Sequence, residues 1–164
     1  MDYFLTAVVA ATFLCALVTG LLLAFAVVVM PGIKTLDDGG FIRAFQVIDR
    51  VIQNNQPVFM LVWVGSVVLL IGAVVLGVGV VSGLERVLLF AAAALYILGV
   101  QLPTAAINVP LNNRLQSLAV DGLGDAERRS ARDAFEPRWN RWNLVRTMVA
   151  SAAVLLLLIL IALL

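Results

Sequence analysis

The sequence predicts an all-α integral membrane protein, a single domain over residues 1–164 that folds as a four-transmembrane-helix bundle. Apolar residues occupy 63% of the 164 positions and charged residues 13%, whereas soluble domains average about half apolar and a quarter charged. Four apolar segments each reach the roughly 20 helical residues that span a bilayer core. None alternates apolar and polar residues as barrel strands do. We expect transmembrane helices at about 3–30, 57–81, 87–112 and 142–164.

The first apolar segment is expected to remain in the membrane as a helix. Met1-Asp2-Tyr3 contains no basic residue, and the apolar stretch is longer than the roughly 7–15 residues typical of a signal peptide. Pro31 and Gly32 both oppose helix continuation, so we expect this helix to end near Met30.

An amphipathic helix is predicted between the first two transmembrane helices, at about 37–55. Its apolar residues recur at helical spacing, and Asp38, Arg43, Asp49 and Arg50 are expected around the opposite face. Such helices commonly lie flat at the membrane interface. This one would either do so or cover the cytoplasmic mouth of the bundle.

The second and third apolar segments are joined by a short turn, Ser82–Arg86, and both are rich in small residues. Small residues let helix backbones approach closely in a membrane. We therefore expect a tightly packed antiparallel hairpin.

The third segment becomes polar toward its end. One helix face carries Gln101, Thr104, Asn108 and Asn112, which are spaced by three or four residues. The prolines at 103 and 110 are expected to kink this helix or to loosen its last turns.

The fourth transmembrane helix is expected to follow a short soluble helix at about 121–136. Trp139 and Trp142 lie near its start, where aromatic residues often mark a membrane interface. Asn143 and Arg146 share a face, and Arg146 has no carboxylate within one helical turn. Arg146 therefore either extends toward the interface or belongs to a buried polar site.

Amide side chains from three separate elements are expected to meet at the cytoplasmic ends of the second, third and fourth helices. With aromatic walls that include Phe45 and Phe59, such a pocket suits a flat apolar molecule with a few oxygens. The predicted substrate-binding residues are Asn55, Gln101, Asn108, Asn112, Trp139, Trp142, Asn143 and Arg146. The pattern assigns no catalytic residue.

The residue inventory excludes several classes of site. The chain contains no histidine and one cysteine, Cys15, so it lacks the commonest metal ligand and proton shuttle; no metal site is expected. The net charge of +1 gives no indication of nucleic-acid binding.

The expected contacts are membrane lipid, a hydrophobic small molecule, and either a second copy in a homo-oligomer or another subunit of a membrane complex.

The basic residues predict the orientation in the membrane. Nine of the ten loop cations lie in the two long loops, after the first and third helices, and only Arg86 lies in the turn between the second and third. The positive-inside rule places both long loops in the cytoplasm and both termini outside. We expect the bacterial inner (plasma) membrane.

These residues resemble the anthrone oxygenase-like family, small four-helix membrane proteins mostly of unknown function. The resemblance is carried by Asn108-Val109-Pro110-Leu111-Asn112 with Arg114-Leu115, and by Trp142-Asn143 with Arg146-Thr147; weaker matches are Met30-Pro31, Phe45-Gln46, and Asn55 with Pro57. The resemblance covers nearly the whole chain and implies a four-helix bundle. For fungal members it implies oxidation of anthrones to anthraquinones by O₂, with no evident metal or flavin cofactor.

Anthrone oxidation requires a base that removes a proton from the ring methylene, and donors that hold the developing oxyanion. The candidate donors are Asn108, Asn112, Asn143 and Arg146. The acids expected near the cytoplasmic mouth are Asp49, Asp133 and Glu136, and none of them lies in the motif. Whether the protein is an enzyme therefore stays open at the level of the sequence.

Two other functions fit the same residues. A non-catalytic accessory subunit that binds a lipid or quinone, or that scaffolds a membrane complex, would need the same polar pocket and apolar helix faces. A transporter subunit is the third alternative, and the lack of acidic residues inside the apolar segments argues against proton coupling.

Overall fold

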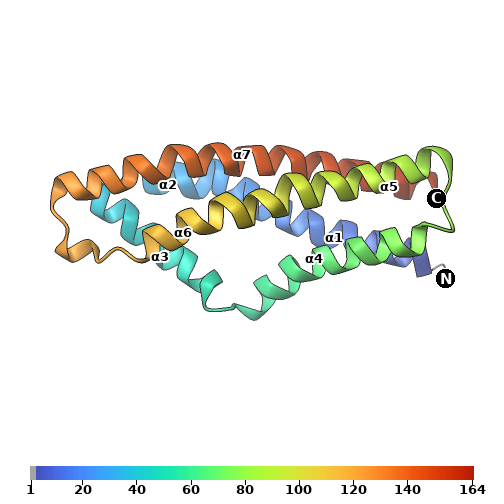
Figure 1. Cartoon of the computed structure of the whole chain (residues 1–164), viewed down its shortest axis with the longest axis horizontal. Coiled ribbons are helices and arrows are strands. Elements are labelled where there is room, and N and C mark those ends of the chain that lie inside the picture. Colours follow the sequence, from blue (N-terminus) through green and yellow to red (C-terminus); the bar gives the residue numbers. More distant parts are fainter. Residues whose placement is uncertain (1–2) are drawn as a thin grey trace.

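The computed structural model describes residues 3–164, which form helices and turns and contain no strand (Figure 1). Four helices are long and apolar enough to cross a membrane: Tyr3–Lys34, Pro57–Gly77, Gly83–Gln116 and Asp125–Leu163. The predicted all-helical class with four apolar helices is thereby confirmed, and it indicates a multi-pass membrane protein.

Two of these long helices consist of several segments. The first comprises α1 (Tyr3–Ala24), the π-helical segment η1 (Phe25–Val29) and α2 (Met30–Lys34). After α3 (Asp38–Gln53) and α4 (Pro57–Gly77), the third long helix comprises α5 (Gly83–Tyr96), the π-helical segments η2 (Ile97–Gln101) and η3 (Thr104–Asn108), and α6 (Val109–Gln116). A short 3₁₀ turn, η4 (Val120–Gly122), precedes α7 (Asp125–Leu163).

Each π-helical segment ends two residues before a proline, namely Pro31, Pro103 and Pro110. At the ends of these segments the backbone N–H of Met30 donates to Phe25 O, and that of Val109 donates to Thr104 O, five residues back. A proline ring clashes with the carbonyl four residues before it in an ordinary α-helix. A π turn widens the helix at that point. The helix can therefore continue through each proline.

Because the helices continue through these prolines, several of the expected helix ends are wrong. The first helix does not end near Met30 but runs to Lys34, and the third runs from Gly83 to Gln116. The expected separate soluble helix does not exist, because α7 is continuous from Asp125 to Leu163 with Pro137 inside it. Phe135 and Trp139 on either side of this proline are buried, and tertiary packing commonly outweighs local helix propensity.

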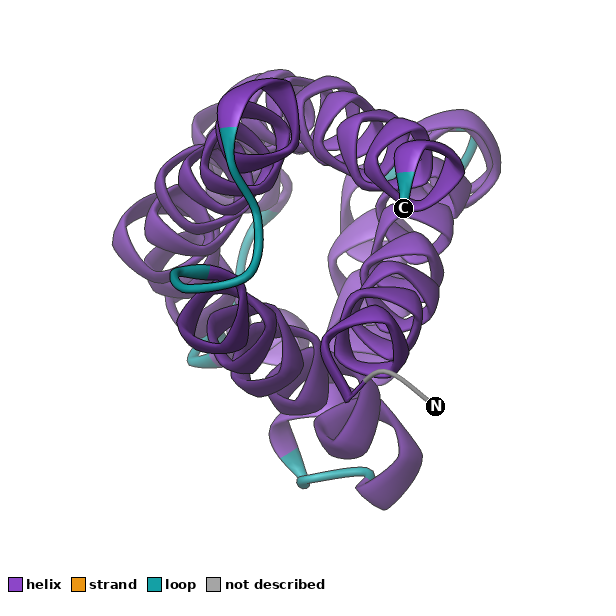
Figure 2. Cartoon of the chain, turned by 90° about the vertical axis from the view of Figure 1, so that its right-hand side faces the viewer, coloured by secondary structure: helices purple, strands orange, loops and turns teal. Residues whose placement is uncertain are grey.

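The bundle has two halves with separate hydrophobic cores. In the half that contains the start of α1 and the end of α7, a core of buried side chains is formed by α1, α4, α5 and α7. In the other half, α3 takes the place of α4 and packs with α2, α6 and the first turns of α7. Figure 1 shows α3 and α4 meeting at a bend, and Figure 2 shows the bundle from the end at which α1 begins.

The expected tight hairpin of the second and third helices is wrong. From their shared turn α4 diverges to pack mainly against α1, while α5 packs mainly against α7. The small residues serve these other contacts: a Cβ at Gly65 would lie 2.9 Å from Leu14 Cδ1 of α1, and a Cβ at Gly99 would lie 2.5 Å from Val149 Cγ1 of α7. The glycines therefore allow close approach, but to different helices.

The helix α3 lies within the range predicted for the amphipathic helix, and its start is fixed by polar contacts. Asp37 caps its start by accepting a hydrogen bond from the backbone N–H of Gly40 at 2.6 Å. Arg132 of α7 donates to the carbonyls of Lys34 and Leu36, at 2.9 and 3.0 Å, and pairs with Asp38 at 3.2 Å. These contacts hold the start of α3 against α7.

One residue of α3 lies on the face opposite to the one expected. The buried residues are Phe41, Ile42, Phe45, Gln46 and Asp49. Asp49 was expected among the charged residues of the outer face, yet it is only 3% exposed. The buried face of α3 therefore brings a carboxylate into the bundle.

Candidate functional site

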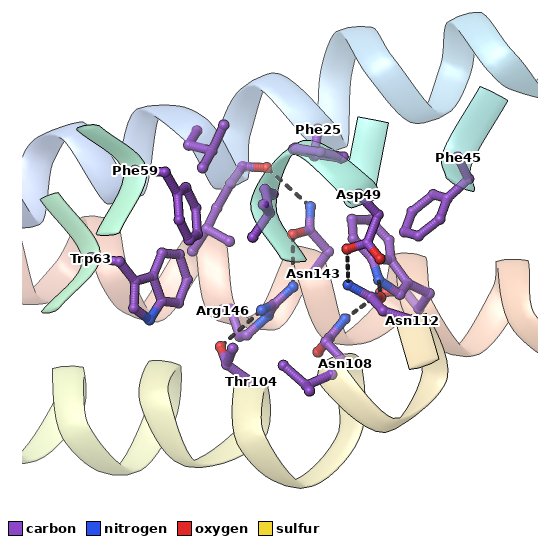
Figure 3. Close-up of a pocket in the computed structure, with 15 residues that line it drawn as sticks. Phe25, Phe45, Asp49, Phe59, Trp63, Thr104, Asn108, Asn112, Asn143 and Arg146 are labelled. Atoms are coloured by element: carbon purple, nitrogen blue, oxygen red, sulfur yellow. Dashed lines mark hydrogen bonds between the residues drawn. The ribbon is translucent and has the colours of Figure 1, made fainter. Parts of the chain in front are cut away.

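A cavity of about 170 Å³ lies where the two cores meet (Figure 3). It is lined by residues of α1, η1, α3, α4, η3, α6 and α7. They are Leu21, Leu22, Phe25, Phe45, Asp49, Ile52, Phe59, Trp63, Thr104, Asn108, Val109, Asn112, Trp139, Asn143 and Arg146. Most of this lining is apolar, with a few polar groups, which is the usual character of a small-molecule site.

Aromatic rings form much of the pocket wall. Phe59 and Trp63 of α4 stack with their centroids 5.4 Å apart and an interplanar angle of 20°. Across the pocket, Trp139 contacts Phe25 and Phe45, with centroid distances of 5.6 and 5.5 Å. A flat hydrophobic ligand fits between such walls, because ring faces and edges favour contact with other rings.

Arg146 is the cation of the pocket, and it is 3% exposed. Its Nη1 donates to Thr104 Oγ1 at 2.8 Å, and its Nη2 donates to Asn143 Oδ1 at 3.0 Å. Asn143 in turn donates to the carbonyl of Leu22 at 3.0 Å. Arg146 therefore does not extend toward the interface. It is held in place by Thr104 of η3 and by Asn143 of α7, which is itself bound to α1.

The two asparagines of the Asn108–Asn112 motif both point into the pocket (Figure 3). Asn112 Oδ1 accepts from the indole N–H of Trp139 at 2.7 Å, and Asn112 Nδ2 donates to Asp49 Oδ1 at 2.7 Å. Asn108 Nδ2 lies 3.5 Å from the carbonyl of Trp139. We expected these amides to meet Asn143 or Arg146; their partners are Trp139 and Asp49 instead.

Asp49 is the anionic group of the pocket. Besides Asn112, its carboxylate accepts from Gln53 Nε2 at 2.6 Å and from Gln116 Nε2 at 3.1 Å. The other two candidate acids lie outside the pocket lining: Asp133 is exposed, and Glu136 pairs with Arg132 at 2.7 Å. Asp49 is therefore the acid that the fold brings to the site.

Two buried polar atoms that belong to pocket-lining residues have no hydrogen-bond partner. They are the Nε of Arg146 and the Oδ1 of Asn108. Nearly all buried polar atoms in proteins have a partner, and an unpaired one costs about 1–3 kcal/mol. A ligand that carries both an acceptor and a donor would satisfy these two atoms.

Five of the eight predicted site residues line this pocket, and Asn55, Gln101 and Trp142 do not. Asn55 is exposed in the turn before α4, where its φ of 57° requires a left-handed conformation that asparagine tolerates. Gln101 follows Val100, which belongs to the core formed by α1, α4, α5 and α7. The Nε2 of Gln101 is buried without a partner. Trp142 precedes Asn143 and so is turned about 100° away from it around the helix.

Two residues of the site, Thr104 and Asp49, were not among the predicted binding residues, although Asp49 was one of the three candidate acids. Thr104 was placed on the polar face of the third helix but not among the binding residues, and it holds Arg146. Asp49 lies four residues after Phe45 and eight after Phe41. This spacing places Asp49 on the same helix face as Phe41 and Phe45. It was the feature of the sequence that could have predicted the burial of Asp49. No group of three or more His, Cys, Asp or Glu side chains arranged to hold a metal occurs within residues 3–164.

Comparison with known proteins identifies a family. The model of the family described as anthrone oxygenase matches residues 44–156, which include every pocket-lining residue from Phe45 to Arg146. No curated protein matches the chain, and no solved structure matches it. The matched region covers well over half of the sequence, and the chain belongs to the anthrone oxygenase family.

Proposed function

We propose that this protein is a membrane enzyme that oxidises a hydrophobic aromatic or quinone-like compound with O₂ in the pocket between α3, α4, η3 and α7. The family match supports the reaction class. The substrate supplies the electrons: once its acidic C–H is deprotonated, the electron-rich anion reacts with O₂. The protein must bind the flat ring, hold the oxygen on which negative charge develops, and accept a proton.

The observation that carries this proposal is that the Arg146 side chain is buried with only neutral hydrogen-bond partners. Burying a cation costs several kcal/mol unless other groups compensate. Arg146 has hydrogen bonds to two neutral side chains, its Cζ lies 5.9 Å from the ring centroid of Trp139, and its Nε has no partner. A charged residue placed this way among membrane helices is a functional group by default. An oxyanion bound at its Nε would give that nitrogen a partner and compensate the charge.

The apolar character of the surroundings supports a substrate that arrives from the membrane. Of the 15 lining residues, Val109 alone is exposed, at 42%. We place the pocket end of the bundle toward the cytoplasm, in a bacterial inner membrane, because nine of the ten loop cations lie on that side.

The test is turnover of a dihydroxyanthrone by the purified protein in nanodiscs, followed by O₂ uptake and by the appearance of the anthraquinone spectrum. Protein-free nanodiscs measure spontaneous oxidation. We compare Arg146→Lys with Arg141→Lys, since Arg141 is an exposed cation on the same helix. Lysine keeps the charge but lacks the planar set of donors, so Arg146→Lys is expected to lose activity and Arg141→Lys to keep it.

Wild-type protein that oxidises the anthrone no faster than empty nanodiscs would contradict the proposal. If it nevertheless retained a lipid or quinone that native mass spectrometry detects, and Arg146→Lys released that molecule, the pocket would serve binding alone. That outcome would establish the alternative, an accessory protein that holds a lipid or quinone.

A further inference from the structure

Asp49 is buried without a cation beside it. Its side chain is 3% exposed, and it forms no salt bridge with any Lys or Arg in the part of the chain that the structure describes. Buried carboxylates are normally paired with a cation or a metal ion, because the uncompensated charge is costly. Here three neutral amides surround it instead, those of Gln53, Asn112 and Gln116.

The direction of two of these hydrogen bonds is fixed by their outer partners. An indole N–H only donates, so the bond from Trp139 turns Asn112 with its oxygen toward Trp139 and its NH₂ toward Asp49. A backbone carbonyl only accepts, so the bond to Gln46 O, at 2.8 Å, turns the NH₂ of Gln116 toward Gln46 and Asp49. Both oxygens of Asp49 therefore face donors and must accept.

The three amides match the geometry of a carboxylate, which accepts hydrogen bonds at both oxygens. The arrangement holds a Brønsted base in an apolar pocket, with Asn112 of α6 setting its orientation. Figure 3 shows Asp49 and Arg146 on different sides of Asn143, at the same cavity.

We propose that Asp49 is the catalytic base of the pocket, which removes the proton from the acidic C–H of the substrate while Arg146 holds the oxygen that becomes negative. This inference rests on the proposed function and selects Asp49 from the three acids that were expected near the cytoplasmic mouth. Asn112 and Trp139 are positioning residues, because they act through Asp49.

The step balances with O₂ as the oxidant. A methylene proton passes to Asp49, and the electron pair of the broken C–H bond stays in the ring anion. The anion reduces O₂ and forms a C–O bond, and the peroxide oxygen takes the proton from Asp49. The O–O bond then breaks as the second methylene proton leaves, so that CH₂ and O₂ become C=O and H₂O, and Asp49 is again a carboxylate.

Proton removal can be measured separately from oxidation. Without O₂ and in D₂O, wild-type protein in nanodiscs is expected to exchange the methylene hydrogens of a dihydroxyanthrone faster than empty nanodiscs do. Asp49→Asn and Asp49→Ser are expected to lose both exchange and aerobic turnover, by about 10²–10⁴-fold, the usual contribution of a positioned base. Serine still accepts the amide hydrogen bonds but is not basic. Asp49→Ser therefore shows whether a loss of activity in Asp49→Asn comes from a folding defect.

The matched control is Asp133→Asn, at an exposed carboxylate outside the pocket lining, with exchange and turnover expected within about twofold of wild type. Formate at high concentration is expected to restore part of the exchange in Asp49→Ser, which a purely structural role would not allow. Wild-type turnover that survives in folded Asp49→Ser or Asp49→Asn overturns the assignment of Asp49 alone. Absence of wild-type turnover overturns the proposed function and, with it, this step.

Discussion

Asp49 and Arg146 line the same cavity from α3 and α7, and they form no salt bridge with each other. Each is held by neutral groups, Asp49 by three amides and Arg146 by a hydroxyl and an amide. Direct pairing would neutralise both charges and fill the space between them. Because they are kept apart, an anion that forms in the pocket can be bound by one while its proton moves to the other.

Trp139→Phe should lower activity without unfolding the protein. Phenylalanine keeps the ring that packs on Phe25 and Phe45 but removes the N–H that fixes Asn112. Asn112 then loses the donor that holds its oxygen and can rotate away from Asp49, which loosens the position of the base. We expect kcat to fall at least tenfold and the protein to stay folded, with a thermal midpoint lowered by the loss of one hydrogen bond. A variant with unchanged kcat would show that Asn112 keeps its orientation by other means.

Asn143→Leu should lower both stability and activity. Asn143 accepts from Arg146 and donates to the carbonyl of Leu22, so leucine leaves a buried cation and a buried carbonyl short of partners. Each such loss costs about 1–3 kcal/mol. Asn140→Leu, on the same helix but outside the pocket lining, is the control. Thermal unfolding in detergent measures the difference, and equal midpoints for the two variants would contradict it.

The polar face of the third helix could be predicted from the sequence because it depends only on helical spacing. Thr104, Asn108 and Asn112 lie on one side of the helix and reach the pocket, as their separation by four residues requires. Arg146 was predicted for the same reason, since it lies three residues after Asn143. Local periodicity sufficed for these residues.

Asp49 was one of three acids expected near the cytoplasmic mouth, but its charge predicted the outer face of α3 rather than the buried one. Four-residue spacing from Phe45 places it on the buried face, but a carboxylate there is costly unless donors compensate. Two of those donors, Asn112 and Gln116, are more than 60 residues away in the chain. Periodicity within one helix contains no information about such distant partners.

Helix pairing could not be predicted either. Small residues in α4 and α5 show that each helix packs closely against a neighbour, but not which neighbour. The structure pairs α4 with α1 and α5 with α7. Continuation of the first helix through Pro31 was also missed, because the π turn that accommodates the proline is not indicated by residue type.

Orientation can be tested with single cysteines. Cys15 is completely buried, so Cys15→Ala provides a background for Ala126→Cys and Ser82→Cys, at two exposed positions. The distribution of loop cations predicts that a membrane-impermeant maleimide added to intact cells labels position 82 and not position 126. Labelling at 126 from outside would reverse the assignment of the pocket to the cytoplasmic side.

Val109 offers a test of how the substrate enters. Its side chain lines the cavity and is 42% exposed. We therefore expect a hydrophobic substrate dissolved in the bilayer to enter past this side chain. Val109→Trp is expected to obstruct that passage and to lower kcat/KM about tenfold or more.

The control is Leu102→Trp, on the same long helix, where the side chain is 57% exposed and does not line the cavity. Because both substitutions add a tryptophan to an exposed apolar surface, expression and helix content should match. If kcat/KM falls only for Val109→Trp, while anaerobic methylene exchange falls in parallel, access rather than oxidation is impaired. Equal kcat/KM values for the two variants would show that the substrate does not enter beside Val109.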